Sequence, residues 1–260
     1  MLNYIKSEFY RVFHTKGFYI FNGACMALML SMNLTLWGVA RTTQGFPYAT
    51  TSFPFSMLYC GGFQAALFLT FALSSLIFGA EFKNRTINNS IAGGCSKEVL
   101  FLGKLIVTLV CCALTLVLVE GTLIGSAYLL LEDAGMEALN KLLLGSVASI
   151  PGLICGSCGA VALFYTLGSD SKATWAWMIL FIGVSAAISL LGMKFQTMNY
   201  LSQWLVYNVL GESTPNPSTG SFQMVWETTE GFWRLVLSGV IGTIVFFITG
   251  LVGVRKVEVK

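Results

Sequence analysis

Charged residues are scarce in this sequence. Asp, Glu, Lys and Arg together make up 10% of its 260 residues, whereas a soluble domain carries roughly 25%. So few charges cannot cover the surface of a soluble domain. The apolar residues also gather in long uncharged runs instead of alternating with polar ones. We therefore expect the chain to lie in a lipid bilayer.

Several kinds of functional motif are also missing. With a single histidine, His14, we expect neither a histidine-based metal site nor a catalytic triad in one chain. The pattern G-x-x-x-x-G-K-[ST] is absent, so the chain does not bind ATP through a P-loop of its own. The basic residues flank apolar runs and form no solvated patch, which argues against nucleic acid as a partner. We expect no enzyme activity, no metal and no cofactor in this chain.

What the sequence does contain is six long apolar runs. They cover residues 18–40, 60–80, 105–131, 142–167, 175–192 and 235–254. Crossing ~30 Å of hydrocarbon takes roughly 20 helical residues. Five runs carry no charge, and the third carries only Glu120. We predict an all-α membrane protein with a single transmembrane domain over residues 1–260 and six spans.

The basic residues are unevenly divided between the two sides of these spans. Eleven lie in the terminal segments and in loops 81–104 and 168–174, and four lie in the alternate loops, which accounts for all 15. Lys and Arg are enriched in cytoplasmic loops. We therefore expect both termini to be cytoplasmic.

Two amphipathic segments accompany the spans. Near the N-terminus, one helical face carries Leu2, Ile5, Phe9, Val12 and Phe13, and the other carries Lys6, Glu8, Arg11 and Lys16. This pattern predicts an interfacial helix on the cytoplasmic leaflet. Before the sixth span, helical spacing relates Met198, Leu201, Leu205, Val206 and Val209. It predicts one short amphipathic helix in the outer leaflet.

Glu120 is the candidate site within the spans. An acidic residue near the centre of a spanning helix costs ~2.5 to 3.5 kcal/mol on insertion scales, so it must face protein or water. It is either a substrate or proton site, or the acceptor of a structural hydrogen bond. Both interpretations stay open. Small-residue pairs with four-residue spacing, Gly121 with Gly125 and Gly152 with Gly156, predict close helix packing.

Residues 81–104 form a polar segment between the second and third runs. Glu81 and Arg85 have the spacing of a helical ion pair. Gly93 and Gly94 predict a stop, and Ser96 followed by Glu98 predicts a new helix start. We expect a short helix against the membrane, a turn, and then the third span.

This segment resembles the permease subunits of ABC-2-type exporters. The similarity is greatest to the small stand-alone bacterial permeases for export of, or immunity to, bacitracin, lantibiotics and other antimicrobial peptides. The matching residues are Glu81-Phe82, Arg85-Thr86, Ser96-Lys97 and Gly103-Lys104. The basic amphipathic helix before the first span is also similar.

The resemblance implies a permease in a bacterial cytoplasmic membrane that exports an amphipathic molecule such as an antimicrobial peptide, a drug or a lipid-like compound. It implies two partner types: a second permease copy or a related permease, and two copies of a P-loop ATP-binding subunit that holds ATP and Mg. Residues 81–95 are then the coupling helix. The residues expected to contact the ATPase are Glu81, Phe82, Arg85, Thr86 and Asn88.

Two other functions remain open. A proton-coupled secondary transporter would use Glu120 as a proton relay, although the sequence shows no inverted repeat and no matching pair of broken helices. The third possibility is a non-transporting membrane module for immunity or sensing.

Overall fold

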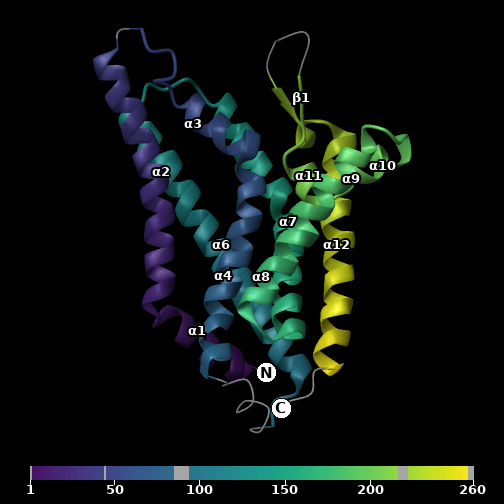
Figure 1. Ribbon diagram of the computed structural model, residues 1–260. Helices are drawn as coiled ribbons and strands as arrows, with labels where there is room; N and C mark the ends of the chain where they lie inside the picture. The colour runs from purple at the N-terminus through teal and green to yellow at the C-terminus, as the bar shows by residue number, and fades with distance from the viewer. Residues whose placement is uncertain (1, 44, 85–93, 216–221, 257–260) are drawn as a thin grey trace.

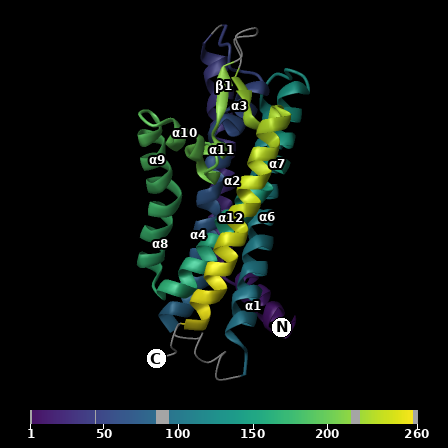
Figure 2. The same ribbon diagram turned by 90° about the vertical axis from the view of Figure 1, so that its right-hand side faces the viewer.

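A computed structural model shows the chain as a bundle of long helices (Figures 1 and 2). It describes residues 2–43, 45–84, 94–215 and 222–256. Among these residues, six helical segments are long and apolar enough to cross a membrane. The protein is thus an all-α multi-pass membrane protein, as predicted from its composition.

Four of the spans are single helices, and two contain a π-helical turn. The single helices are α2 (Lys16–Thr42), α6 (Lys97–Leu130), α7 (Glu137–Leu167) and α12 (Thr229–Lys256). The second span consists of α3 (Ser52–Met57), the π-turn η1 (Leu58–Gly62) and α4 (Phe63–Asn84). The fifth consists of α8 (Asp170–Met178), the π-turn η2 (Ile179–Gly183) and α9 (Val184–Gly192).

All six spans begin earlier than the apolar runs indicate. The third starts at Lys97 and not at residue 105, because a polar first turn continues the same helix. The Ser96 hydroxyl accepts a hydrogen bond from the Val99 N–H at 3.3 Å, so the predicted helix start is confirmed. Hydropathy identifies only the apolar part of a spanning helix and not its polar end turns.

Helix α1 (Leu2–Phe13) and the end of α12 lie at the same end of the bundle (Figure 1). We call this the terminus end. The opposite, loop end carries α3, the short helices α10 (Gln196–Ser202) and α11 (Val206–Leu210), and a hairpin of β1 (Ser213–Pro215) and β2 (Phe222–Met224). A 3₁₀ turn, η3 (Val225–Glu227), leads from the hairpin towards α12.

Helix α7 is the centre of the bundle. It packs along α12 and against α4, and Figure 2 shows α7 and α12 side by side. A Cβ atom on Gly239 of α12 would lie 2.5 Å from the backbone carbon of Pro151, so the two backbones almost touch. Gly152 and Gly156 also lie against neighbouring segments, as predicted. Gly121 and Gly125 do not, because a Cβ on either would meet no atom within 4 Å.

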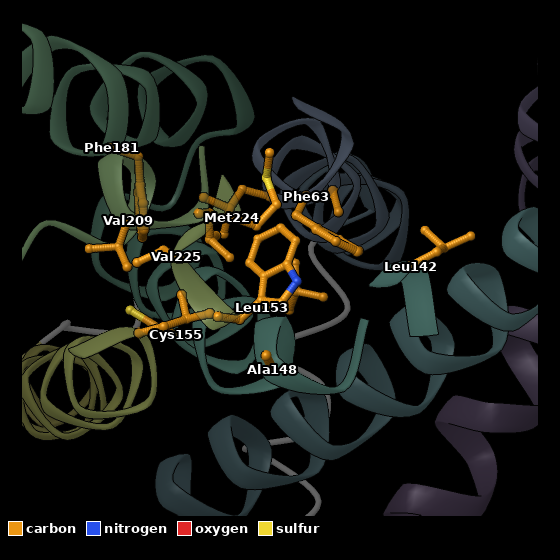
Figure 3. Close-up of a cluster of buried hydrophobic side chains, with 14 of the residues drawn as sticks. Phe63, Leu142, Ala148, Leu153, Cys155, Phe181, Val209, Met224 and Val225 are labelled. Atoms are coloured by element: carbon orange, nitrogen blue, oxygen red, sulfur yellow. The ribbon is translucent and has the colours of Figure 1, made fainter. Parts of the chain in front are cut away.

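The core has a loop-end part and a terminus-end part. Figure 3 shows the first, where Phe63 and Leu153 belong to one cluster with Met224 and Val225. A series of ring contacts joins the fifth span to this core, since Trp177 packs on Phe71 of α4 and on Phe181, which stacks on Phe246 of α12. The ring centroids in these pairs are 4.8 to 5.4 Å apart.

Helix α1 forms as predicted, but its predicted polar face was wrong at Glu8. That side chain is buried, and its carboxylate accepts hydrogen bonds from Lys104 of α6 and from Arg11. Lys104 is itself fully buried. The Tyr4 ring lies where Gly103 has no side chain, since a Cβ there would be 2.7 Å from the ring. Helix α1 therefore docks on the bundle, and Leu2 is left exposed.

The predicted single helix before the sixth span was also wrong. The chain leaves the helical conformation at Leu205, which separates α10 from α11. The Asn208 amide donates to the Ser202 carbonyl at 2.9 Å, so a side chain bridges the break. Val209 and Leu210 are buried, hence α11 packs into the bundle.

Candidate binding pocket around Glu120

A cavity of about 340 Å³ lies among the second span, α2 and α6. Three methionines line it: Met29, Met32 and Met57. Glu120 is the only charged residue in its described lining. Its size is at the lower end of the ~300 to 1,000 Å³ range of pockets for small molecules. An apolar cavity with one carboxylate has the composition of a ligand site.

The floor of this pocket is buried and its rim is exposed. Phe63 and Val119 are almost completely covered, whereas Leu28 is 65% and Met57 is 56% exposed. The pocket therefore opens on the outer surface of the bundle. Because the surrounding helices are candidate spans, this opening lies on the side of the bundle and not at either end.

Glu120 is held by one neighbouring helix. The Ser146 hydroxyl of α7 lies 2.9 Å from Glu120 Oε1 and also 2.9 Å from the Leu142 carbonyl, and its single proton can serve either. No basic residue pairs with Glu120 among the described residues. Ten residues separate Glu120 from the end of α6 at Leu130, about 15 Å along the axis. Both interpretations of Glu120 therefore stay open. Its hydrogen bond to α7 agrees with a structural role, and its position in the pocket lining agrees with a substrate or proton site.

The π-turn η1 shapes one wall of the pocket. Leu58 and Gly62, its first and last residues, both line the cavity. A Cβ on Gly62 would lie 2.3 Å from the Leu58 side chain, so only glycine admits this position of Leu58. Such turns are rare and occur frequently at functional sites. Hydropathy does not predict η1, and the only sequence signal for it is the pair Gly61-Gly62.

One buried side chain attaches the α2 wall to α6. Asn33 is fully buried, and its amide donates to the Leu123 carbonyl at 3.0 Å and to the Ser126 hydroxyl at 2.7 Å. This residue was also missed, since a neutral amide does not interrupt an apolar run. A lone asparagine within a span is a signal that could have identified it.

The residues expected to contact an ATPase lie apart from this pocket. Glu81 and Phe82 belong to the last turns of α4 at the terminus end, although their side chains are not described. Arg85, Thr86 and Asn88 lie outside the described residues. The structure therefore does not test the coupling helix. No group of acidic, histidine and cysteine side chains within the described ranges could hold a metal ion.

Comparison with known protein families and with curated proteins gives no match for this chain. Its class therefore rests on the fold: an all-α multi-pass membrane protein with a pocket on the side of its helix bundle.

Proposed function

We propose that this chain is the permease subunit of an ATP-driven exporter that moves an amphipathic molecule out of the cytoplasm or the membrane. The observation that carries the proposal is the pocket around Glu120, which lies within the spans and opens on the side of the bundle. A molecule dissolved in the bilayer can reach such a pocket without entering water.

The energy source is assigned to a partner. The chain has no P-loop motif, and its resemblance to ABC-2 permeases at residues 81–104 indicates two ATP-binding subunits that hold ATP and Mg. A second copy of this chain or a related permease completes the transporter. The positive-inside bias supports cytoplasmic termini for this chain. The resemblance to bacterial permeases then implies that these subunits bind on the cytoplasmic side of a bacterial membrane.

The arrangement of α6 supports this assignment. It starts directly after the proposed coupling segment and continues without a break to Leu130. Glu120 therefore lies on the same continuous helix that begins at Lys97. Movement of the coupling segment by an ATPase is transmitted to one wall of the pocket.

A proton-coupled secondary transporter is the second candidate. The observation that favours it is the bonding of Glu120, whose one described partner is a hydroxyl and not a base. Such a carboxyl group can exchange a proton without breaking an ion pair. The two candidates differ in whether the protein works with an ATPase.

Co-purification from the native membrane tests the proposal. We expect the tagged chain to bring with it a P-loop subunit and measurable ATP hydrolysis. Arg85→Glu should lower the co-purified ATP hydrolysis at least tenfold, because a docking contact to a carboxylate becomes repulsive. Lys172→Glu is the matched control, since it reverses an exposed charge in the other predicted cytoplasmic loop, outside the coupling segment, and it should retain the activity.

Equal ATP hydrolysis in both variants removes Arg85 from the contact with the ATPase and weakens the coupling-helix assignment. A different result would overturn the whole proposal. A chain that purifies without any ATPase, and that acidifies liposomes in exchange for a solute, is a proton-coupled transporter.

A further inference from the structure

We infer that the pocket around Glu120 binds its substrate as an amphipathic cation, with the positive group at the Glu120 carboxylate and the apolar part on the methionine wall. This inference rests on the proposed export function and specifies its substrate class. Of the expected substrates, which extend from peptides to lipid-like compounds, the inference specifies a small cationic amphiphile.

The negative charge in the pocket indicates that the ligand is positively charged. Glu120 is the one charged group in the described lining, and its described hydrogen-bond partner is the Ser146 hydroxyl at Oε1. An ionised carboxylate can accept about four hydrogen bonds. An ammonium group therefore finds an acceptor with remaining capacity, and a phosphonium group is attracted by the negative charge alone. An anion is repelled by Glu120.

The energetic reason lies in the surrounding lipid. An unpaired acidic side chain near the middle of a span costs about 2.5 to 3.5 kcal/mol. A bound ammonium or phosphonium group supplies the missing counter-charge and offsets part of this cost. A neutral ligand of the same shape gives no such compensation.

The other lining residues indicate the apolar character and the size of the rest of the ligand. Met29, Met32 and Met57 are flexible and polarizable, and such side chains adapt to ligands of different shapes. The volume of about 340 Å³ admits a drug-sized molecule or one end of a longer one, and it excludes a whole folded peptide. The exposed rim at Leu28 and Met57 opens to lipid, where an amphiphile concentrates.

Binding of tetraphenylphosphonium tests the inference directly. The purified transporter, with any subunits that accompany it, is placed in phosphatidylcholine nanodiscs and compared with empty nanodiscs. Tetraphenylborate has the same shape and the opposite charge. We expect protein-dependent binding of the cation and at least tenfold weaker binding to Glu120→Gln. Glu98→Gln is the matched control, because Glu98 lies on the same helix but pairs with Arg255 outside the pocket.

A second measurement separates loss of the site from loss of the fold. Cys25 lines the pocket, so the bound cation should slow its modification by maleimide at least threefold in the wild type. Ala65→Leu fills the pocket from an exposed lining position without changing its charge and should weaken binding of the cation by a similar factor as Glu120→Gln. Both variants should unfold at temperatures close to the wild type.

The inference is overturned if tetraphenylborate binds as well as the cation, or if Glu120→Gln binds the cation as tightly as the wild type. These outcomes are distinguishable from failure of the export proposal. A preparation that hydrolyses ATP but does not bind the cation refutes only the pocket assignment. A preparation that binds the cation without any ATPase refutes only the energy source.

Discussion

The N-terminal arm, α1 and α2, and the central pair, α7 and α12, are held in the bundle by different forces. Helix α7 approaches α12 so closely that Gly239 has no room for a Cβ. Helix α2 has few buried residues and is attached through Asn33, while α1 is attached through Glu8. Lipid is as apolar as leucine, so spans associate by close packing or by polar contacts. The central pair relies mainly on close packing, whereas the arm combines buried polar contacts with packing such as that of Tyr4 on Gly103.

The difference bears on the pocket. One wall belongs to α2, which polar contacts hold, and the other walls belong to the second span and α6. A helix held by a few hydrogen bonds can shift at small energetic cost, whereas interlocked backbones cannot. We therefore expect the pocket to change size by movement of the arm. Three substitutions test this contrast, from the largest expected effect to the smallest.

The ion pair between Glu8 and Lys104 should give the largest effect. Lys104 is fully buried, and removing a partner from a buried pair costs on the order of 3 kcal/mol. We expect Glu8→Gln to lower the free energy of unfolding by about this amount. A double-mutant cycle with Lys104→Met, measured by unfolding in mixed micelles, should give a coupling energy above about 1 kcal/mol. Strictly additive effects would show that the arm is attached in another way.

The contact between α7 and α12 should give the next effect. Gly239→Ala places a methyl group against the Pro151 backbone, and overpacking of this kind costs about 1 to 3 kcal/mol. Gly121→Ala is the control, because its methyl group meets no atom and alanine favours a helix by about 1 kcal/mol over glycine. Thermal unfolding should show a lower midpoint temperature for Gly239→Ala and no decrease for Gly121→Ala. Equal midpoints for the two variants would contradict the close packing of the central pair.

The smallest effect is expected at Asn33. Hydrogen bonds between spans contribute on average ~0.6 kcal/mol and at most ~1.7 kcal/mol, so Asn33→Leu should destabilise the protein only slightly. It should nevertheless free α2 and speed the modification of Cys25, measured by mass spectrometry of the labelled peptide. Asn22→Leu is a matched control, since Asn22 is also buried on α2 but donates within its own helix to the Phe18 carbonyl. Equal labelling in the two variants would show that Asn33 does not hold the pocket wall.

The sequence predicts the six spans because each is a local property of one apolar run. It cannot predict the partner of Glu8, since Lys104 is 96 positions away and a helical pattern places every charge on the polar face. The break at Leu205 depends on the Asn208 side chain and on burial of Val209. In the pocket, Glu120 was identifiable as the one charge within a span, whereas η1 and Asn33 act through shape and a neutral amide. Orientation in the membrane and the coupling residues 81–88 stay predictions.

Helix α6 has 34 residues and is therefore about 51 Å long, well beyond the ~30 Å of hydrocarbon. The sequence of this helix contains no proline that would bend it. From Lys97 to Glu120 the axis measures about 35 Å, so a 10° tilt about the first turn moves the carboxylate by roughly 6 Å. That displacement exceeds the length of an ion pair. A tilt of this size is thus sufficient to separate Glu120 from a charge that stays bound to another wall of the pocket.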